Sequence, residues 1–170
     1  MKSILFSAAL ICINIASIAQ LPHASIYVHA LYASPIDQSS KLYFNDGFGG
    51  VAGFLVGEKT TRFNAFIGYS SFFATGNNTS GNETYVPVKV GIRQYIPLTR
   101  HFLFLQGNAG LGFVSNGHDN TNYTPFAFDI GGGVKIAGFE GALVWDNFAE
   151  KNPSGWSSWV TIQAGFNLGF

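Results

Sequence analysis

The chain of 170 residues has the length of one domain. Charged residues make up only 11% of it, and aromatic residues reach 16%, whereas ordinary soluble domains are about 25% charged. Water is therefore not expected on every side of the fold, and the formal net charge of zero leaves no electrostatic basis for binding nucleic acid.

The first element of the chain has the pattern of a secretory signal peptide. Lys2 precedes an apolar stretch over residues 4–13, and the small residues Ser17 and Ala19 follow it. This pattern predicts cleavage between Ala19 and Gln20. Elsewhere the chain has no run of about 20 apolar residues, which excludes a helical membrane span from the mature protein.

Cleavage at this point divides the chain into a signal peptide, residues 1–19, and a single mature domain, residues 20–170. The only cysteine, Cys12, lies in the signal peptide. Leu10 and Ile11 stand where a lipoprotein would have small residues, so we do not expect lipidation. Without cysteine in the mature chain, disulfides cannot contribute to its stability.

Eight segments of the mature chain alternate apolar and polar residues with period two, which is the pattern of a β-strand with one apolar face. Turn-forming residues such as Gly, Pro and Asn separate them. The second segment is rich in glycine, and its register is ambiguous. The predicted strands cover residues 24–33, 48–57, 61–73, 83–96, 101–114, 123–136, 139–148 and 156–170.

The connections between these strands alternate in length. Long polar connections cover residues 34–47, 74–82, 115–122 and 147–155, and short turns lie between the other strands. An even number of antiparallel strands with both ends on one side produces this alternation. The sequence therefore predicts an all-β fold, an eight-stranded antiparallel up-and-down transmembrane β-barrel whose mature termini both face the periplasm.

The last predicted strand is the most regular. Every second residue from 160 to 170 is apolar, and the run of eleven residues exceeds the roughly 5–6 residues of an average strand. A tilted membrane strand needs about 9–11. The ending, with apolar side chains at Phe166, Leu168 and Phe170, resembles the signal by which outer-membrane barrels are recognised for assembly. It offers an edge that another sheet can extend by strand addition.

The polar face of the strands indicates which side of the barrel faces water. It consists mainly of Gly, Asn, Ser, Gln and Thr with one or two charges per strand, whereas a water-facing surface is about 25–35% charged. We therefore expect the apolar face to contact lipid. The lumen of an eight-stranded barrel is just wide enough to be filled by side chains, which suits short polar residues.

The few charged residues of the polar face are nearly balanced in sign. Buried charges are expected to be paired, so we predict an ionic network inside the lumen. Its members are Arg62, Lys89, Arg93, Asp129, Lys135, Glu140 and Asp146.

Aromatic residues gather near the predicted strand ends, as in the two interfacial girdles of a membrane barrel. By the long connections these are Tyr32, Tyr69, Phe73, Phe113, Tyr123, Trp145 and Trp156; by the short turns they are Phe63, Phe139 and Phe170.

Taken together, the chain resembles small eight-stranded outer-membrane proteins, namely the barrel domain of OmpA-type proteins and OmpX-like proteins. The residues that carry the resemblance are the signal peptide ending at Ala19, Tyr95-Ile96-Pro97-Leu98 leading into His101-Phe102-Leu103, and the ending from Phe166 to Phe170. A Gln after the cleavage site, here Gln20, is similar to many Bacteroidota envelope proteins.

This resemblance implies an integral protein of the bacterial outer membrane, and we expect a monomer with no cofactor. Its implied partners are outer-membrane lipid, lipopolysaccharide and, during biogenesis, the β-barrel assembly machinery. No peptidoglycan-binding domain follows the barrel in this sequence, so the tethering role of full-length OmpA-type proteins is not expected.

No catalytic constellation accompanies these features. Some eight-stranded barrels modify lipid A with a His, a Ser and an acidic residue near the membrane, but His23, His29, His101 and His118 show no such grouping with an outward Ser and a carboxylate. His118 beside Asp119 lacks further metal ligands nearby. We therefore expect a structural or surface-interaction barrel that acts through its long loops rather than an enzyme. The alternatives are a lipid-modifying or small-ligand barrel and, less favoured, a soluble lipocalin-like binder.

Overall fold

The computed structural model describes residues 23–58, 60–75, 81–96, 103–116, 122–150 and 155–169. Several sequence predictions lie outside these ranges. They concern the cleavage site at Ala19 and Gln20, the terminal Phe170, and the histidines His101 and His118.

The described chain is almost entirely β-structure, as the alternating pattern predicts. Nine strands and one short helix follow one another. They are β1 (His23–Pro35), α2 (Gln38–Tyr43), β2 (Phe44–Gly57), β3 (Thr61–Ala74), β4 (Glu83–Tyr95), β5 (Leu103–Asn116), β6 (Asn122–Tyr123), β7 (Phe126–Ile136), β8 (Phe139–Ala149) and β9 (Trp156–Gly169).

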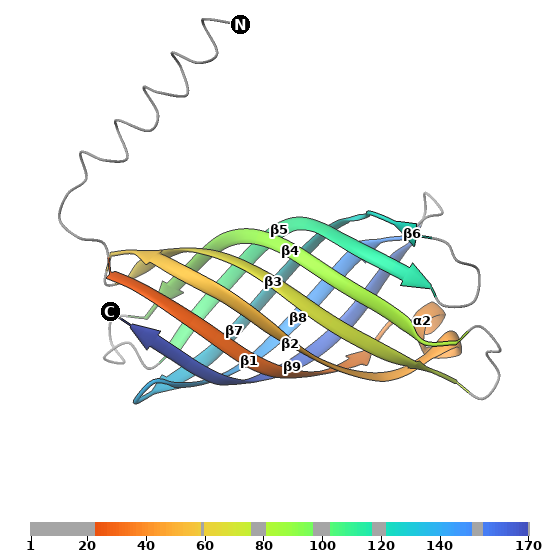
Figure 1. The fold of residues 1–170 in the computed structure, drawn as a ribbon, viewed down its shortest axis with the longest axis horizontal. Coiled ribbons are helices and arrows are strands. Elements are labelled where there is room, and N and C mark those ends of the chain that lie inside the picture. Colours follow the sequence, from red (N-terminus) through yellow and green to blue (C-terminus); the bar gives the residue numbers. More distant parts are fainter. Residues whose placement is uncertain are drawn as a thin grey trace, which may run out of the picture.

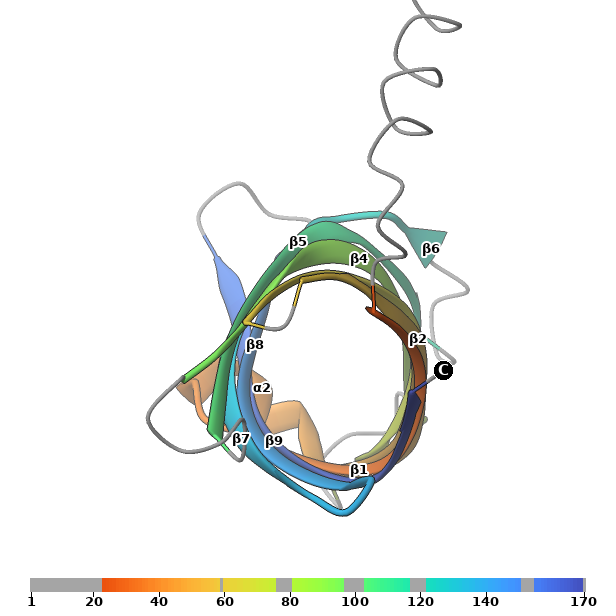
Figure 2. The same cartoon turned by 90° about the vertical axis from the view of Figure 1, so that its left-hand side faces the viewer.

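The strands form one closed antiparallel sheet. Each long strand pairs with the next long strand along the chain, and β1 pairs with β9 over eleven residue pairs from Ser25–Gly169 to Pro35–Trp159. Figures 1 and 2 show the resulting barrel from the side and along its axis. Because β6 and β7 both pair with β5, they make up one position in the ring. The predicted eight-stranded up-and-down barrel is thereby confirmed.

The two ends of the barrel differ in their connections. We call the end where β1 begins and β9 finishes the turn end, because the short turns lie there, and the opposite end the loop end (Figure 1). At the turn end Ala137 and Gly138 join β7 to β8 with positive φ angles of 48° and 88°. Positive φ at both central residues is the geometry of a type I′ hairpin turn.

Three details differ from the sequence prediction. The predicted strand 123–136 is interrupted, because the nitrogen of Pro125 has no hydrogen to donate to the ladder. The Pro125 carbonyl still accepts a hydrogen bond from Gly112 N at 2.9 Å. The predicted connection 34–47 contains α2 and the first residues of β2. Asp37 begins this helix by accepting a hydrogen bond from Ser40 N at 2.7 Å.

The alternation of side chains assigns one apolar face to the outside. Large apolar side chains on every long strand point away from the lumen and are exposed, up to 69% for Phe63 and 67% for Leu168. Soluble monomers rarely expose contiguous apolar patches beyond a few hundred Å². The register of β2, ambiguous in the sequence, places Phe48 and Phe54 outward and Leu55 inward. No helix among the described residues is long and apolar enough to cross a membrane.

Candidate functional site

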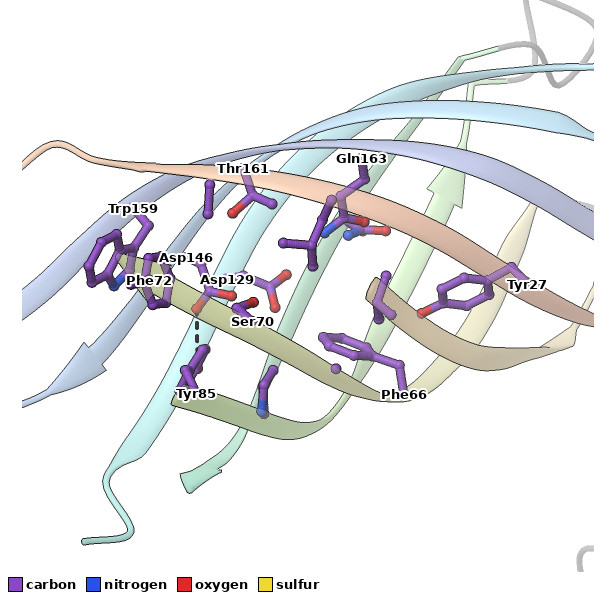
Figure 3. Close-up of a pocket in the computed structure, with 16 residues that line it drawn as sticks. Tyr27, Phe66, Ser70, Phe72, Tyr85, Asp129, Asp146, Trp159, Thr161 and Gln163 are labelled. Carbon is purple, nitrogen blue, oxygen red and sulfur yellow. Dashed lines mark hydrogen bonds between the residues drawn. The ribbon is translucent and has the colours of Figure 1, made fainter. Parts of the chain in front are cut away.

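The lumen holds a buried ionic cluster around Lys89 of β4. The sheet register places Asp129 of β7 directly opposite Asp146 of β8, and like charges in such a pair repel. Lys89 Nζ reaches both from across the lumen, at 3.1 Å from Asp129 Oδ2 and 2.7 Å from Asp146 Oδ1. Asn108 Nδ2 donates to Asp129 Oδ1 at 2.6 Å. Tyr85 OH donates to Asp146 Oδ1 at 3.4 Å (Figure 3). Lys89 therefore neutralises a pair of aspartates that would otherwise destabilise the β7–β8 hairpin.

A second buried cluster surrounds Glu140 of β8, nearer the turn end. Arg93 Nη1 donates to Glu140 Oε2 at 2.8 Å, and Asn167 Nδ2 donates to Glu140 Oε1 at 2.6 Å. His29 Nε2 lies 3.2 Å from Glu140 Oε2. The Arg93 guanidinium also donates twice to Gln106 Oε1, at 3.2 and 2.9 Å. Both charges of this pair are thus hydrogen-bonded as well as paired, which is the condition for burying an ion pair without a large penalty.

Aromatic rings enclose the Arg93 guanidinium. Its central carbon lies 4.1 Å from the centre of the Phe104 ring and 5.1 Å from that of Tyr27. Cations over ring faces are stabilised by the ring quadrupole, more strongly where water is excluded. Arg93 is therefore held by charge, hydrogen bonds and ring contacts at once.

Side-chain amides connect the two clusters. Tyr27 OH donates to Asn64 Oδ1 at 2.8 Å, Asn64 Nδ2 donates to Asn108 Oδ1 at 2.9 Å, and Asn108 in turn donates to Asp129. These residues belong to the polar face recognised in the sequence, but their place in the network was not predicted. Alternation identifies a lumen-facing amide, whereas its partner depends on the relative height of strands that are not neighbours.

Two of the seven predicted network residues stand apart from these clusters. Among the described residues, no carboxylate lies within ion-pair distance of Arg62 or Lys135. Arg62 instead donates to Ser25 Oγ at 3.4 Å, and its guanidinium lies 5.2 Å from the centre of the Tyr95 ring. Both cations sit near the turn end and are only partly buried, so water can solvate them without a carboxylate.

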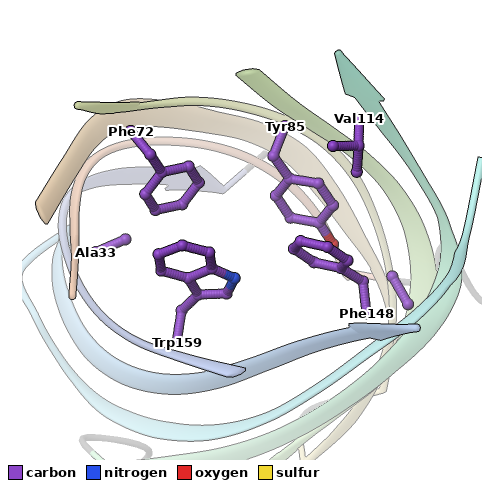
Figure 4. Close-up of a cluster of buried hydrophobic side chains, with 7 residues drawn as sticks. Ala33, Phe72, Tyr85, Val114, Phe148 and Trp159 are labelled. Carbon is purple, nitrogen blue, oxygen red and sulfur yellow. The ribbon is translucent and has the colours of Figure 1, made fainter. Parts of the chain in front are cut away.

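An aromatic layer crosses the lumen toward the loop end. Phe72 of β3 stacks on Trp159 of β9 with ring centres 3.9 Å apart, and Tyr85 of β4 stacks on Phe148 of β8 at 4.8 Å (Figure 4). Phe148 and Trp159 join the two pairs at 6.4 Å. This layer was not predicted from the sequence, because the inward face was interpreted as polar. The parity of the residue numbers could have found it, since Trp159 alternates in phase with Thr161.

The described part of the lumen holds a small cavity below the aromatic layer. A cavity of about 20 Å³ lies among Ser70, Gln106, Thr161 and Gln163, bounded by Trp159 toward the loop end (Figure 3). A buried water needs roughly 10–15 Å³ of such volume. This cavity therefore has room for one or two water molecules.

The outer surface carries aromatic clusters at both ends. At the loop end Phe128 lies 5.3 Å from Trp156 and 6.4 Å from Trp145, measured between ring centres. At the turn end Phe139 and Phe166 meet edge to face at 5.8 Å. One residue expected in this set is placed differently, because Tyr123 packs against the aromatic layer of the lumen.

The two described residues of the predicted assembly signal, Phe166 and Leu168, point outward and are 61% and 67% exposed. Both edges of their strand, β9, are hydrogen-bonded in the closed barrel, one to β1 and one to β8. An edge that another sheet could extend therefore exists only before the barrel closes.

The described histidines form no grouped site. His29 belongs to the Glu140 cluster, and His23 lies exposed at the start of β1. Among the described residues there is no group of three His, Cys, Asp or Glu side chains that could hold a metal ion.

Comparison with known proteins rests on structure, since neither a protein-family model nor a curated protein sequence matches the chain. The attachment invasion locus protein Ail of Yersinia pestis has 12% sequence identity and a TM-score of 0.61, with 88% of this chain and 100% of that chain covered.

Two further solved structures are similar. The N-terminal β-barrel domain of Pseudomonas aeruginosa OprF has 13% identity and a TM-score of 0.60 over 86% of this chain and 99% of that chain. Neisserial surface protein A has 9% identity and a TM-score of 0.58 over 86% and 97%. At these identities the likeness concerns the fold, and the fold of this chain is that of the small eight-stranded outer-membrane barrels.

Proposed function

We propose that the protein is an integral outer-membrane β-barrel with a filled lumen, and that it has a structural or surface-interaction role exerted through its loop end. The observation that carries this proposal is the combination of an exposed apolar outer face with a buried polar lumen. In water this arrangement would be inverted. In a bilayer it satisfies both the lipid contact outside and the hydrogen bonds of every strand inside.

The dimensions of the strands support a membrane location. The long strands contain 11 to 14 residues, and a tilted membrane strand needs about 9–11. Aromatic clusters at the two ends of the outer face correspond to the positions of interfacial girdles. In this proposal the turn end, with both mature termini, faces the periplasm, and the loop end faces outward.

The lumen supports a structural role over transport. The aromatic layer spans it, and the cavity below accommodates only one or two waters. The parts left to meet partners are the loops. The names of Ail and Neisserial surface protein A refer to attachment and to a surface location. For this chain, we include in the proposal a surface role, contact with lipopolysaccharide and recognition by the assembly machinery. The proposal also includes its monomeric state and a Bacteroidota-type affiliation, based on Gln20.

Cell fractionation tests the location. The mature protein should remain in the outer-membrane fraction after salt and alkaline washes and require detergent for extraction. Recovery of a soluble mature protein from the periplasm would contradict the proposal and favour a lipocalin-like binder. Purified barrel added to a planar bilayer should give no stable large conductance, and a steady open channel would contradict the filled lumen.

Loop replacement separates a structural role from a surface-interaction role. A variant with the four long connections shortened to Gly/Ser turns should still insert and migrate as a compact barrel. Persistence of the envelope phenotype in this variant indicates a structural role, and its loss indicates that the loops carry the function.

A further inference from the structure

Two carboxylates lie at the loop end of the lumen, beyond the aromatic layer. Glu83 begins β4 and faces the lumen in phase with Tyr85, and Glu150 follows β8 in phase with Phe148. Because Tyr85 and Phe148 stack on each other, the inward side chains two residues further along both strands lie at a similar level of the lumen. Glu83 and Glu150 therefore lie at the same end of the lumen as Tyr123, which packs against the aromatic layer.

Glu83 is a buried carboxylate without a partner in the described part of the chain. Only 6% of its surface is exposed. No lysine, arginine or histidine among the described residues lies within 4.0 Å of its oxygens, and no described donor hydrogen-bonds to them. The described cations of the lumen begin at Lys89, on the other side of the aromatic layer. A buried charge in such surroundings requires a compensating charge or must be neutralised.

Glu150 is held in position beside Glu83. Its Oε1 accepts a hydrogen bond from the buried Ser157 Oγ at 3.1 Å. Its Oε2 lies against Gly155, where a Cβ atom would collide with it. Its backbone N–H donates to the Gly155 carbonyl at 3.0 Å. The base of the β8–β9 connection therefore fixes this carboxylate at the mouth of the lumen.

Several described side chains at this mouth offer oxygen atoms as ligands. They comprise the carboxylates of Glu83 and Glu150 and the hydroxyls of Tyr123 and Ser157. Hard divalent cations prefer such ligands, and Ca²⁺ accepts six to eight of them in flexible geometry, whereas Mg²⁺ demands a near-ideal octahedron. Because these residues come from different hairpins of the barrel, a cation tolerant of irregular geometry suits them better.

We propose that the loop end of the lumen binds a divalent cation of the Ca²⁺ type between Glu83 and Glu150, with water completing the coordination. The cation would supply the positive charge that Glu83 lacks, and it would join β4 to the β8–β9 connection across the mouth. The site depends on the closure of the barrel and not on the proposed membrane role.

Terbium luminescence tests this site, since Tb³⁺ replaces Ca²⁺ at oxygen sites and is excited through nearby aromatic rings. The full-length mature barrel, washed with EDTA in non-ionic detergent, should show saturable Tb³⁺ emission that Ca²⁺ displaces. Glu83→Gln and Glu150→Gln should each weaken the apparent affinity by about tenfold or more, because affinity follows the number of charged ligands. Glu58→Gln, which removes an exposed acid near the turn end, should leave the affinity unchanged.

A second measurement protects the test against misfolding of a variant. Ca²⁺ should raise the thermal unfolding temperature of the wild-type barrel relative to EDTA, and the increase should be absent in Glu150→Gln. Emission that Ca²⁺ does not displace, or that persists unchanged in both glutamate variants, would overturn the proposal. So would a wild-type unfolding temperature that is equal in Ca²⁺ and EDTA, because Glu83 would then be neutralised by a proton.

Discussion

Lys89 lies between two aspartates that the sheet places opposite each other. Replacing Lys89 with Met keeps the length of the side chain but leaves Asp129 and Asp146 facing each other in the lumen. Removing one partner from a buried ion pair costs about 3–5 kcal/mol. We expect Lys89→Met to lower the free energy of unfolding by that amount, measured by urea titration of the refolded barrel in detergent.

The control for this prediction removes the stranded charges as well. Lys89→Met combined with Asp129→Asn and Asp146→Asn should recover much of the loss, because neutral amides opposite each other do not repel. If the single and the triple variant are equally unstable, packing around Lys89 rather than its charge is responsible.

Two glycines on neighbouring strands, Gly91 of β4 and Gly107 of β5, offer a matched comparison. Gly91 points into the lumen, where an added Cβ would overlap the backbone carbonyl of Gly107. Gly107 points outward, and a Cβ there would meet no atom nearer than Asp129 O at 4.0 Å. Gly91→Ala should therefore prevent compact folding or strongly destabilise the barrel. Gly107→Ala should be neutral or stabilise it by about 0.5–1 kcal/mol.

Heat modifiability on gels and urea titration measure both glycine variants. Equal tolerance of alanine at positions 91 and 107 would show that β4 and β5 can move apart at this point, contrary to the contact described here.

At the scale of the elements, the alternating pattern was sufficient to predict the strands and their outward faces. Period two is a local property, so a strand carries it in its own sequence. The partners of the lumen residues were only partly predictable. That Lys89 meets Asp129 and Asp146 depends on the stagger between strands far apart in sequence, and so does the meeting of Phe72 with Trp159. The helix α2 was missed because its six residues are too few to show a helical period.

The β7–β8 turn contains a residue that does not suit its geometry. Ala137 has a φ of 48°, a left-handed conformation that costs a residue with a Cβ about 1–2 kcal/mol. Ala137→Asn would create the Asn-Gly pair that type I′ turns favour, and we expect a more stable barrel. The measurement is the urea midpoint, and Ala142→Asn, inside β8, serves as a destabilising comparison. An unchanged or lower midpoint for Ala137→Asn would contradict this view of the turn.

A prediction about the kinetics of assembly concerns Phe170. This residue lies outside the described residues, but in the sequence it continues the alternation of Phe166 and Leu168. Phe170→Ala should sharply reduce insertion into the outer membrane of cells, because the terminal ring is expected to be read by the assembly machinery. Burial of one ring contributes at most roughly 1.5–3 kcal/mol, too little to abolish the finished barrel. The same variant refolded in detergent should therefore still migrate as a compact barrel.

Phe63→Ala is the matched control for the terminal residue. Phe63 is also an outward aromatic residue near the turn end, 69% exposed, but it lies on β3. Insertion of Phe63→Ala should equal that of the wild type. Equal insertion of Phe170→Ala would argue against a recognition role for the terminal residue.

At the scale of the whole molecule, the lumen is organised in layers across the barrel axis. The Glu140 cluster, the Lys89 cluster and the aromatic layer each join strands that are not neighbours in the sheet. Backbone hydrogen bonds hold adjacent strands together, and these layers hold opposite walls. The interior therefore stabilises the cross-section as well as filling it.

Removing the aromatic layer tests this organisation. Phe72→Ala and Trp159→Ala should each lower the free energy of unfolding by about 3–5 kcal/mol, the usual cost of truncating a large buried ring. The double variant should lose less than the sum of the two, because the rings stack on each other. Strict additivity in urea titrations would show that the two rings contribute independently.

The double variant also bears on permeability. With both rings absent, water should reach the cavity beside Ser70, and a bilayer recording should show brief small openings that the wild type lacks. A silent double variant would indicate that the lower clusters alone close the lumen.

Glu140 contacts both strands of the seam at which β1 and β9 meet. Its two carboxylate oxygens contact His29 of β1 and Asn167 of β9, one from each side of that seam, while Arg93 holds the same carboxylate from the opposite wall. Separating β1 from β9 would take His29 away from Glu140 and break the backbone ladder, whereas Asn167 would stay beside Glu140 on the neighbouring strand. A residue of a third strand, β8, therefore connects the two strands of the seam inside the lumen. The contact between His29 and Glu140 can form only after the ring has closed. It therefore favours completion of assembly and opposes lateral reopening of the barrel.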